Sequence, residues 1–533
     1  MKVMWMIKSA VAIAVVLLLA GCILQPTEDT GTVSLAISAE GGSIGARALD
    51  IESSEDTGTP QVARVWMYSN GSEFRLTPTT DSAPSSPNYA ETVLTGGRGE
   101  IVIDGVPAGE GYSLVVVLGE RQASETDSNQ QVFVPTSYAR TGNFRVSPGL
   151  ATVVTPNRVN LVSDDTGVTR AVYDLVGRAM NSVVLANGTA YAADGGAYYE
   201  RGSDGFTQSE TVADINSLSV GEWLGGGEVL AINTDTGIEM PDVEFEMPSE
   251  ITNVTLSGTF LVDNDGANDD AVVFYQRIGG LGGGVFEGTA EGVVAPAQDD
   301  WEDISATELN DEAGLELLDP DTSPVRSLAS SGNNGFFATD ALGNFMVTEE
   351  LFTDTSEEDT EDLQPADFLS GDVDGLTPFN VPYPGTTRPL RLDHMEVVTV
   401  DGAEFLVVGT PRGAFTFPIN SIGGVEDVFV DESNTVRTDG TGFRSLIRDE
   451  AVSALTTDRS GELLAIATAQ SIVVLDVADG IPTSRDEAIL ILPQRGASLG
   501  QPNGIALELV EATSTIRLYV AGVEGMTTIE ADR

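Results

Sequence analysis

Cysteine and histidine are almost missing from this 533-residue chain, which has only Cys22 and His394. A single cysteine excludes an intrachain disulfide, a cysteine nucleophile deeper in the chain and any zinc site of the Cys/His type. A Ser–His–Asp triad would have to use His394. Its neighbour Asp393 points to the opposite face of a predicted strand, and no G-x-S-x-G turn precedes it. We therefore predict no catalytic residue of these classes.

Basic residues are scarce as well. Lys2 and Lys8 are the only lysines, and the chain without its first 21 residues has 24 arginines against 82 acidic residues, a formal charge of −58. Such a surface repels nucleic acid and anionic headgroups, so nucleic acid is excluded as a partner. The excess of carboxylates predicts salt-dependent stability, whereas codon bias would explain the missing lysine alone.

Long apolar runs are limited to the N-terminus. Ala10 to Ala20 carries no charge, follows the two lysines and leads into Leu19-Ala20-Gly21-Cys22. Eleven residues suit a signal peptide and fall short of the roughly 20 that a membrane span needs. The ending resembles the lipobox of bacterial lipoproteins. An ordinary secretion signal with an incidental cysteine is the alternative.

The lipobox resemblance implies recognition of Leu19, Ala20 and Gly21 by signal peptidase II, and lipidation of Cys22. It divides the N-terminus into a signal peptide, 1–21, and a lipidated tether, 22–31. The bilayer then becomes a partner through the acylated Cys22. The location that follows is the bacterial cell envelope, and Ile23 in place of aspartate favours the outer membrane over the inner.

Residues 32–161 contain short alternating strands separated by turns rich in Gly, Pro and Ser, which predicts a β-sandwich. Within them, GEIVIDGVPAGEGYSLVVVLG (99–119) resembles the signature of transthyretin-like sandwiches, the carboxypeptidase-regulatory and CnaB-like group. The resemblance implies a stalk, spacer or accessory binding module. Without lysine it cannot form the Lys–Asn isopeptide bond of some members. Trp66 and Tyr68 fit either a hydrophobic core or a sugar-binding face.

Residues 169–533 repeat one hairpin pattern seven times. Two apolar alternations flank a turn that usually ends in glycine, as in LVVGTPRG (406–413) and LYVAGVEG (518–525). We predict an all-β chain in which the small sandwich precedes a seven-bladed β-propeller. A strand near 171–176 would close it by pairing with the C-terminal blade. Acidic insertions near 295–325 and 351–388 are expected to be loops, and an array of further sandwiches is the alternative fold.

One acidic stretch has the shape of a metal loop. Asp263, Asp265 and Asp269 in VDNDGANDDAVVF (262–274) resemble the calcium loops of FG-GAP-like propeller blades, because clustered oxygens suit a hard cation. Leu261 stands where that loop would begin with aspartate. Calcium is therefore one interpretation, and a solvated acidic hairpin is the other.

The sequence favours a non-enzymatic envelope lipoprotein that presents a propeller surface to an envelope protein or an extracellular polysaccharide. A carboxylate-dependent glycan hydrolase or lyase is an alternative, and it needs paired carboxylates about 5–10 Å apart at the propeller mouth. A structural coat lipoprotein is the third reading. The fold alone does not decide among them.

Overall fold

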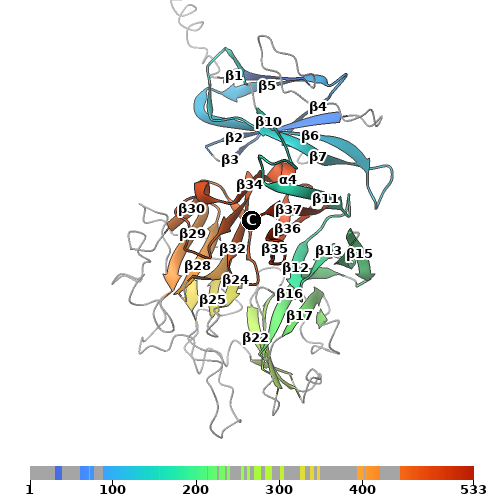
Figure 1. Ribbon diagram of the computed structural model, residues 1–533, viewed down its shortest axis with the longest axis vertical. Coiled ribbons are helices and arrows are strands. Elements are labelled where there is room, and N and C mark those ends of the chain that lie inside the picture. Colours follow the sequence, from blue (N-terminus) through green and yellow to red (C-terminus); the bar gives the residue numbers. More distant parts are fainter. Residues whose placement is uncertain are drawn as a thin grey trace, which may run out of the picture.

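The fold is all-β, with one short α-helix, α4 (Gln494–Ala497), among the described residues. The computed structural model describes residues 30–38, 61–70, 72–76, 88–154, 157–203, 205–212, 214–224, 227–234, 237–239, 254–256, 261–263, 269–277, 283–290, 301–304, 325–330, 336–340, 345–347, 393–400, 403–419 and 444–533. The N-terminal strands form one body, and the remaining sheets lie below it (Figure 1).

The N-terminal body, which we call the sandwich, has two sheets. The smaller has the order β5 (Arg98–Pro107), β1 (Thr30–Ser38), β9 (Ala151–Val153). The larger has the order β10 (Asn157–Asn160), β7 (Gln131–Arg140), β6 (Gly109–Ala123), β2 (Gln61–Ser69), β3 (Ser72–Phe74), with β4 (Ala90–Val93) paired to β2 and β8 (Phe144–Val146) paired to β6. The predicted sandwich therefore forms.

Strand β6 shows how alternation builds the sandwich. Tyr112, Leu114 and Val116 point into the core between the two sheets, as predicted, together with Val33 and Leu35 from the opposite sheet. The chain crosses from one sheet to the other between β5 and β6. There the Tyr112 hydroxyl donates a hydrogen bond to the Pro107 carbonyl at 2.9 Å.

The remaining strands, from residue 168 onward, make up what we call the repeat region. One four-stranded sheet has the order β11 (Val168–Asp174), β37 (Gly525–Asp532), β36 (Thr515–Gly522), β35 (Pro502–Val510), and a second has the order β12 (Ser182–Ala186), β13 (Thr189–Ala193), β14 (Tyr198–Gly202), β15 (Gly205–Glu210). A third has the order β27 (His394–Val400), β28 (Ala403–Thr410), β29 (Gly413–Ile419), β30 (Arg444–Arg448). A fourth has the order β31 (Val452–Thr457), β32 (Leu463–Thr468), β33 (Ser471–Asp476), β34 (Leu490–Pro493). A three-stranded sheet has the order β24 (Val325–Ser330), β25 (Phe336–Asp340), β26 (Phe345–Val347). Edge strands of neighbouring sheets lie side by side: β27 lies beside β31, and β31 lies beside β35.

An eight-stranded sheet completes the repeat region. Its order is β18 (Gly237–Glu239), β17 (Gly227–Thr234), β16 (Ile215–Leu224), β20 (Leu261–Asp263), β21 (Asp269–Arg277), β22 (Gly283–Ala290), β23 (Trp301–Ile304), with β19 (Val254–Leu256) paired to β21. The parallel pairing of β16 with β20 joins two antiparallel groups into one sheet. Strand β23 corrects one prediction, because it lies inside the segment 295–325 that was expected to be a loop. Its backbone pairs with β22 instead. The segment 351–388 lies outside the described residues.

All seven predicted hairpins are antiparallel strand pairs: β13–β14, β17–β18, β21–β22, β25–β26, β28–β29, β32–β33 and β36–β37. Glycine supplies a positive φ at three of these turns, with 88° at Gly195, 141° at Gly413 and 144° at Gly525. The predicted pairing of a strand near 171–176 with the C-terminal hairpin is confirmed, because β11 pairs with β37 and places Ala171 opposite Ile529.

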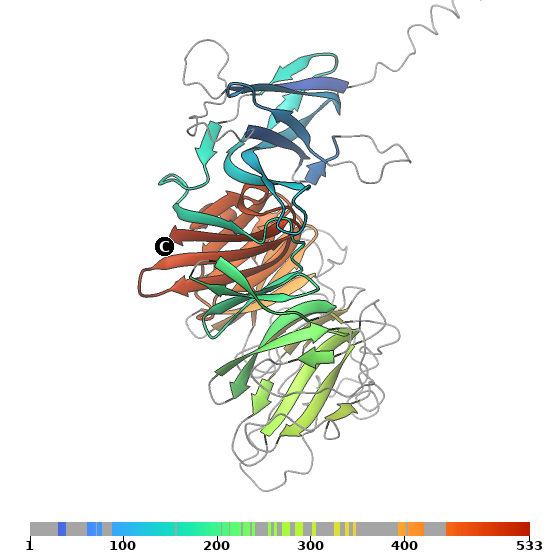
Figure 2. The same cartoon turned by 90° about the vertical axis from the view of Figure 1, so that its right-hand side faces the viewer.

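The sandwich and the repeat region share a hydrophobic core. The face of β6 that carries Val115 and Val117 turns away from the sandwich core and packs in one cluster with Leu492 and Ala497. Figure 2 shows the sandwich seated directly on the sheets that contain β34 and β36. Trp66 and Tyr68 belong to this shared cluster and are 6% and 0% exposed, so their interpretation as core residues is confirmed.

Candidate binding site at the junction

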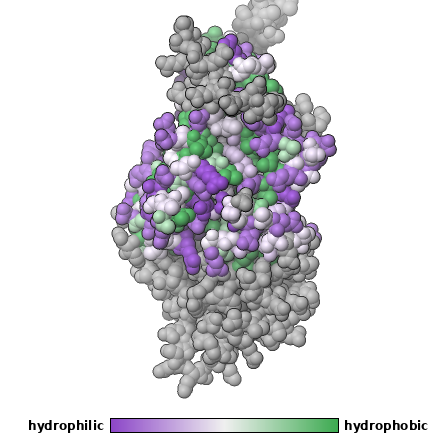
Figure 3. All heavy atoms as spheres, turned by 45° about the vertical axis from the view of Figure 1, so that its right-hand side comes forward, coloured by the Kyte–Doolittle hydropathy of each residue, from purple (hydrophilic) through white to green (hydrophobic). Residues whose placement is uncertain are grey.

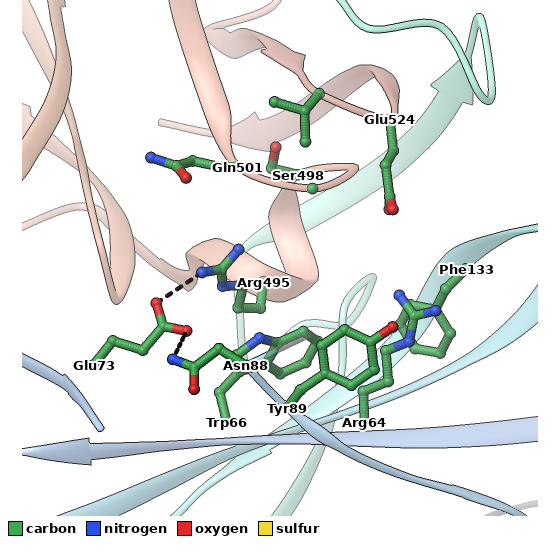
Figure 4. A pocket seen from close by; sticks show the side chains of 12 residues that line it. Arg64, Trp66, Glu73, Asn88, Tyr89, Phe133, Arg495, Ser498, Gln501 and Glu524 are labelled. Atoms are coloured by element: carbon green, nitrogen blue, oxygen red, sulfur yellow. Dashed lines mark hydrogen bonds and ion pairs between the residues drawn. The ribbon is translucent and has the colours of Figure 1, made fainter. Parts of the chain in front are cut away.

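A pocket of about 260 Å³ opens between the sandwich and the repeat region. Its lining residues are Arg64, Trp66, Glu73, Asn88, Tyr89, Phe133, Arg495, Ser498, Gly500, Gln501, Val523 and Glu524. The first six come from the sandwich. The others come from α4, the segment after it and the β36–β37 turn, and the two groups face each other in Figure 4.

Alternation along β2 places Arg64 and Trp66 on the face of the larger sheet that turns toward the repeat region. The Arg64 guanidinium lies 4.5 Å from the ring centre of Tyr89 and 4.4 Å from that of Phe133. Its Nε donates to Glu91 at 2.7 Å, and Glu91 also pairs with Arg121. These contacts fix Arg64 as a cationic layer between two rings.

The opposite wall is organised by Arg495 on α4. Its guanidinium lies 5.5 Å from the Trp66 ring centre, and its Nη2 donates to Glu73 at 3.0 Å. Glu73 also accepts a hydrogen bond of 2.7 Å from the Asn88 amide. This chain of contacts runs from the repeat region into the sandwich, and it holds the floor of the pocket rigidly.

Several polar groups of the pocket remain unused. The Nε of Arg495 and the hydroxyl of Ser498 are buried and have no hydrogen-bond partner. Within the part of the chain that the structure describes, no side-chain hydrogen bond or ion pair engages the Gln501 amide or the Glu524 carboxylate either. An unpaired buried polar group costs about 1–3 kcal/mol, so stability alone does not explain this lining.

Tyrosine hydroxyls at the junction are desolvated. Burial raises the pKa of Tyr68 to about 12, partly offset by the Arg495 guanidinium. Burial also raises the pKa of Tyr89, and the nearby Arg64 opposes that rise. Both tyrosines are therefore neutral hydrogen-bonding groups at physiological pH. The Tyr68 hydroxyl donates to the Ala469 carbonyl of the repeat region at 3.3 Å.

The residues predicted from sequence lie elsewhere. Leu19, Ala20, Gly21 and Cys22 are outside the described residues. Asp263 ends β20, Asp269 begins β21, and Asp265 falls in the undescribed stretch between them.

Because β20 and β21 pair antiparallel, Asp263 and Asp269 lie at the same end of the sheet. No group of three or more potential metal ligands was found among the residues that the structure describes.

His394 begins β27, as the sequence predicted, and its neighbour Glu396 is half-buried on the same strand. Burial raises the pKa of Glu396 to about 8, so this carboxyl is mostly protonated at neutral pH. Residues i and i+2 of a strand share a face, so His394 and Glu396 point to the same side of the sheet.

Most of the pocket was missed by sequence reasoning. Trp66 was considered as a binding residue, but Arg495, Ser498, Gln501 and Glu524 lie more than 400 positions further along the chain and carry no motif. A signal was present in the composition. In a chain so poor in basic residues, arginines that occur within apolar strands, such as Arg64 in QVARVWMYS, indicate an electrostatic role.

Comparisons with known proteins leave the family open. No family model matches the chain, and no curated protein matches it. Among solved structures, the extracellular domain of the hybrid two-component system BT4673 from B. thetaiotaomicron is similar over 67% of this chain, with 11% identity and a TM-score of 0.39. This chain covers 39% of that structure.

A second solved structure, YCF48 bound to D1 peptide, is similar over 68% of this chain and 94% of its own, with 9% identity and a TM-score of 0.36. Scores this low add nothing to the all-β class read from the strands themselves. No helix within the described ranges has the length and apolar character needed to cross a membrane.

Proposed function

We propose that this protein is a lipid-anchored envelope lipoprotein that binds a ligand and catalyses no reaction. Acylated Cys22 holds it to a bacterial membrane, the outer one by the identity of Ile23. The sandwich and a closed seven-bladed propeller form the exposed body. The partner is an envelope protein or an extracellular polymer.

The closed seven-bladed arrangement is supported by the seven hairpins and by the pairing of β11 with β37. In a propeller this pairing joins the two ends of the ring within one sheet. The eight-stranded sheet contributes two of the seven blades, one around β16–β18 and one around β20–β23. Such a ring is a rigid scaffold for binding groups on its loops.

The observation that carries the binding function is the junction pocket. It lies between two bodies that share a core, and it presents polar groups that the protein itself does not pair. Its carboxylate Glu73 is occupied by Arg495 and Asn88, so the lining has one free carboxylate, Glu524, and not the pair of free carboxylates that a glycan hydrolase uses. Binding therefore explains the pocket better than chemistry does.

Recovery of the acylated protein from its native envelope tests this function. We expect a ligand, protein or glycan, to co-purify in a stoichiometric amount, as identified by mass spectrometry. A Cys22→Ser variant is the control for anchoring, and we expect it to lose both the acyl mass and the membrane fraction. Release of the wild-type protein without lipid, or purification without any ligand, would contradict the proposal.

Glu396 favours one second candidate, a carboxylate-dependent glycan hydrolase or lyase. A carboxyl that is protonated at neutral pH has the state that a general acid requires. Release of reducing sugar by the wild-type chain, and its loss in Glu396→Gln, would establish this activity. Equal release of reducing sugar in wild type, in Glu396→Gln and in buffer would exclude the hydrolase or lyase activity.

A further inference from the structure

We infer that the ligand of the junction pocket is a neutral saccharide unit. This inference rests on the proposed binding function and adds the chemical class of the ligand. It also places the binding site between the sandwich and the repeat region. Four features of the pocket carry it: the mixture of free donors and acceptors, the balance of charge, the size and the character of the walls.

The free polar groups suit hydroxyls. Arg495 Nε can only donate and the Glu524 carboxylate can only accept, whereas the Ser498 hydroxyl and the Gln501 amide can do both. A sugar hydroxyl also donates and accepts, so neighbouring hydroxyls of one ring can satisfy donors and acceptors together. Ser498 is 2% exposed, and its hydroxyl has no hydrogen-bond partner among the described residues.

The charge of the pocket is balanced, although the chain as a whole is strongly acidic. Arg64 and Arg495 face Glu73 and Glu524 in the same lining. A carboxylated or phosphorylated ligand would lack an excess of cations to neutralise it, and would also meet the repulsion of the acidic surface. An uncharged polar ligand avoids both costs.

Size and walls agree with one sugar unit. A volume of about 260 Å³ lies just below the roughly 300–1,000 Å³ of pockets that hold drug-sized molecules. The rings of Trp66 and Tyr89 lie 5.3 Å apart and tilted, and Val523 is 42% exposed on the other side. Tyr89 and Val523 can cover the C–H edges of a sugar, with Trp66 buried behind Tyr89. The one face shown in Figure 3 mixes hydrophilic and hydrophobic residues over its described part.

Calorimetric titration of the full chain in detergent micelles tests the inference. The probes are neutral monosaccharides and disaccharides, N-acetylated sugars and the corresponding uronic acids. We expect a neutral sugar to bind and its uronic acid to bind more weakly. Ser498→Ala and Gln501→Ala should each raise Kd by about three- to tenfold, the effect of one hydrogen bond.

The matched control is Thr528→Val, which also removes a buried and unpaired hydroxyl but lies on β37 away from the pocket lining. It should leave Kd unchanged. Ser498→Ala should keep or raise Tm, because it deletes an unsatisfied group, so weaker binding would not reflect poor folding. A neutral sugar that fails to bind, equal Kd values for Ser498→Ala and wild type, or tighter binding of the uronic acid would each overturn the inference. If a protein partner co-purifies from the envelope while no sugar binds, the proposed function survives and the saccharide assignment fails.

Discussion

Replacing Trp66 by alanine should loosen the contact between the sandwich and the repeat region. Trp66 and Met67 are neighbours on β2, but they point to opposite faces of the sheet. Trp66 belongs to the cluster shared with the repeat region, and Met67 belongs to the core inside the sandwich. The pair Trp66→Ala and Met67→Ala therefore separates the junction from the sandwich core.

The expected size follows from burial. Trp66 is 6% exposed, and a buried tryptophan covers about 150–250 Å². At about 25 cal/mol per Å², the lost burial is roughly 4–6 kcal/mol, and measured Phe/Trp→Ala changes are about 3–5 kcal/mol. The contact with the Arg495 guanidinium is lost as well. Met67→Ala should cost about 2–5 kcal/mol, confined to the sandwich.

Differential scanning calorimetry distinguishes the two effects. The wild-type sandwich and the repeat region should unfold together, because they share a core. Trp66→Ala should split off a transition of the sandwich at lower temperature, and the repeat region should keep most of its own Tm. Met67→Ala should lower the temperature of the sandwich transition, and the junction should not bind ANS below that temperature. A Trp66→Ala cost below about 0.5 kcal/mol, typical of a surface site, would refute the shared core.

Three further predictions concern turns, protons and metal. Gly413→Ala should destabilise the chain by more than Gly480→Ala. Both glycines have φ near +140°, but only at Gly413 would the new Cβ lie 2.1 Å from a backbone oxygen, the Ile447 carbonyl. Equal Tm losses in the two variants would show that φ alone determines the cost. The raised pKa of Glu396 means that the folded chain keeps this proton to higher pH than the unfolded chain. The stabilisation of the fold by this proton should be complete below about pH 4.5 and lost as the pH rises through about 8. Wild type should therefore lose Tm relative to Glu396→Gln between about pH 4.5 and 8. Parallel Tm profiles of the two proteins would contradict this prediction. We expect calcium and magnesium to shift Tm equally, as for a solvated acidic loop at 263–269; a calcium-specific rise would establish the ion site instead.

Local pattern was enough to predict the hairpins. In LVVGTPRG (406–413), alternation defines two strands, and Gly413 adopts the positive φ that ends the turn. The pairing of β11 with β37 was also predictable, because the predicted propeller needs its first strand beside its last. Strand β23 was not, because its four residues lie in an acidic stretch and their pairing depends on β22 alone.

The junction could not be predicted for a different reason. Strand β6 is buried along most of its length, but from sequence one apolar face looks like any other covered surface. Which body covers Val115 and Val117 depends on contacts with residues near 490–500, and no local rule reports such distant contacts. For the same reason Trp66 could be assigned to a core, while its place beside Arg495 and Ser498 could not be foreseen.

The pairing of β11 with β37 also determines the order in which parts of the chain can fold. Thr169 and Glu530 share a hydrogen bond although 361 positions separate them. Their sheet cannot form until both strands have left the ribosome and crossed any membrane on the way. Until then the cluster that covers Trp66 is incomplete, because it draws on Leu518 and Ile529 of the same sheet. The slowest folding event should therefore be the late pairing of β11 with β37.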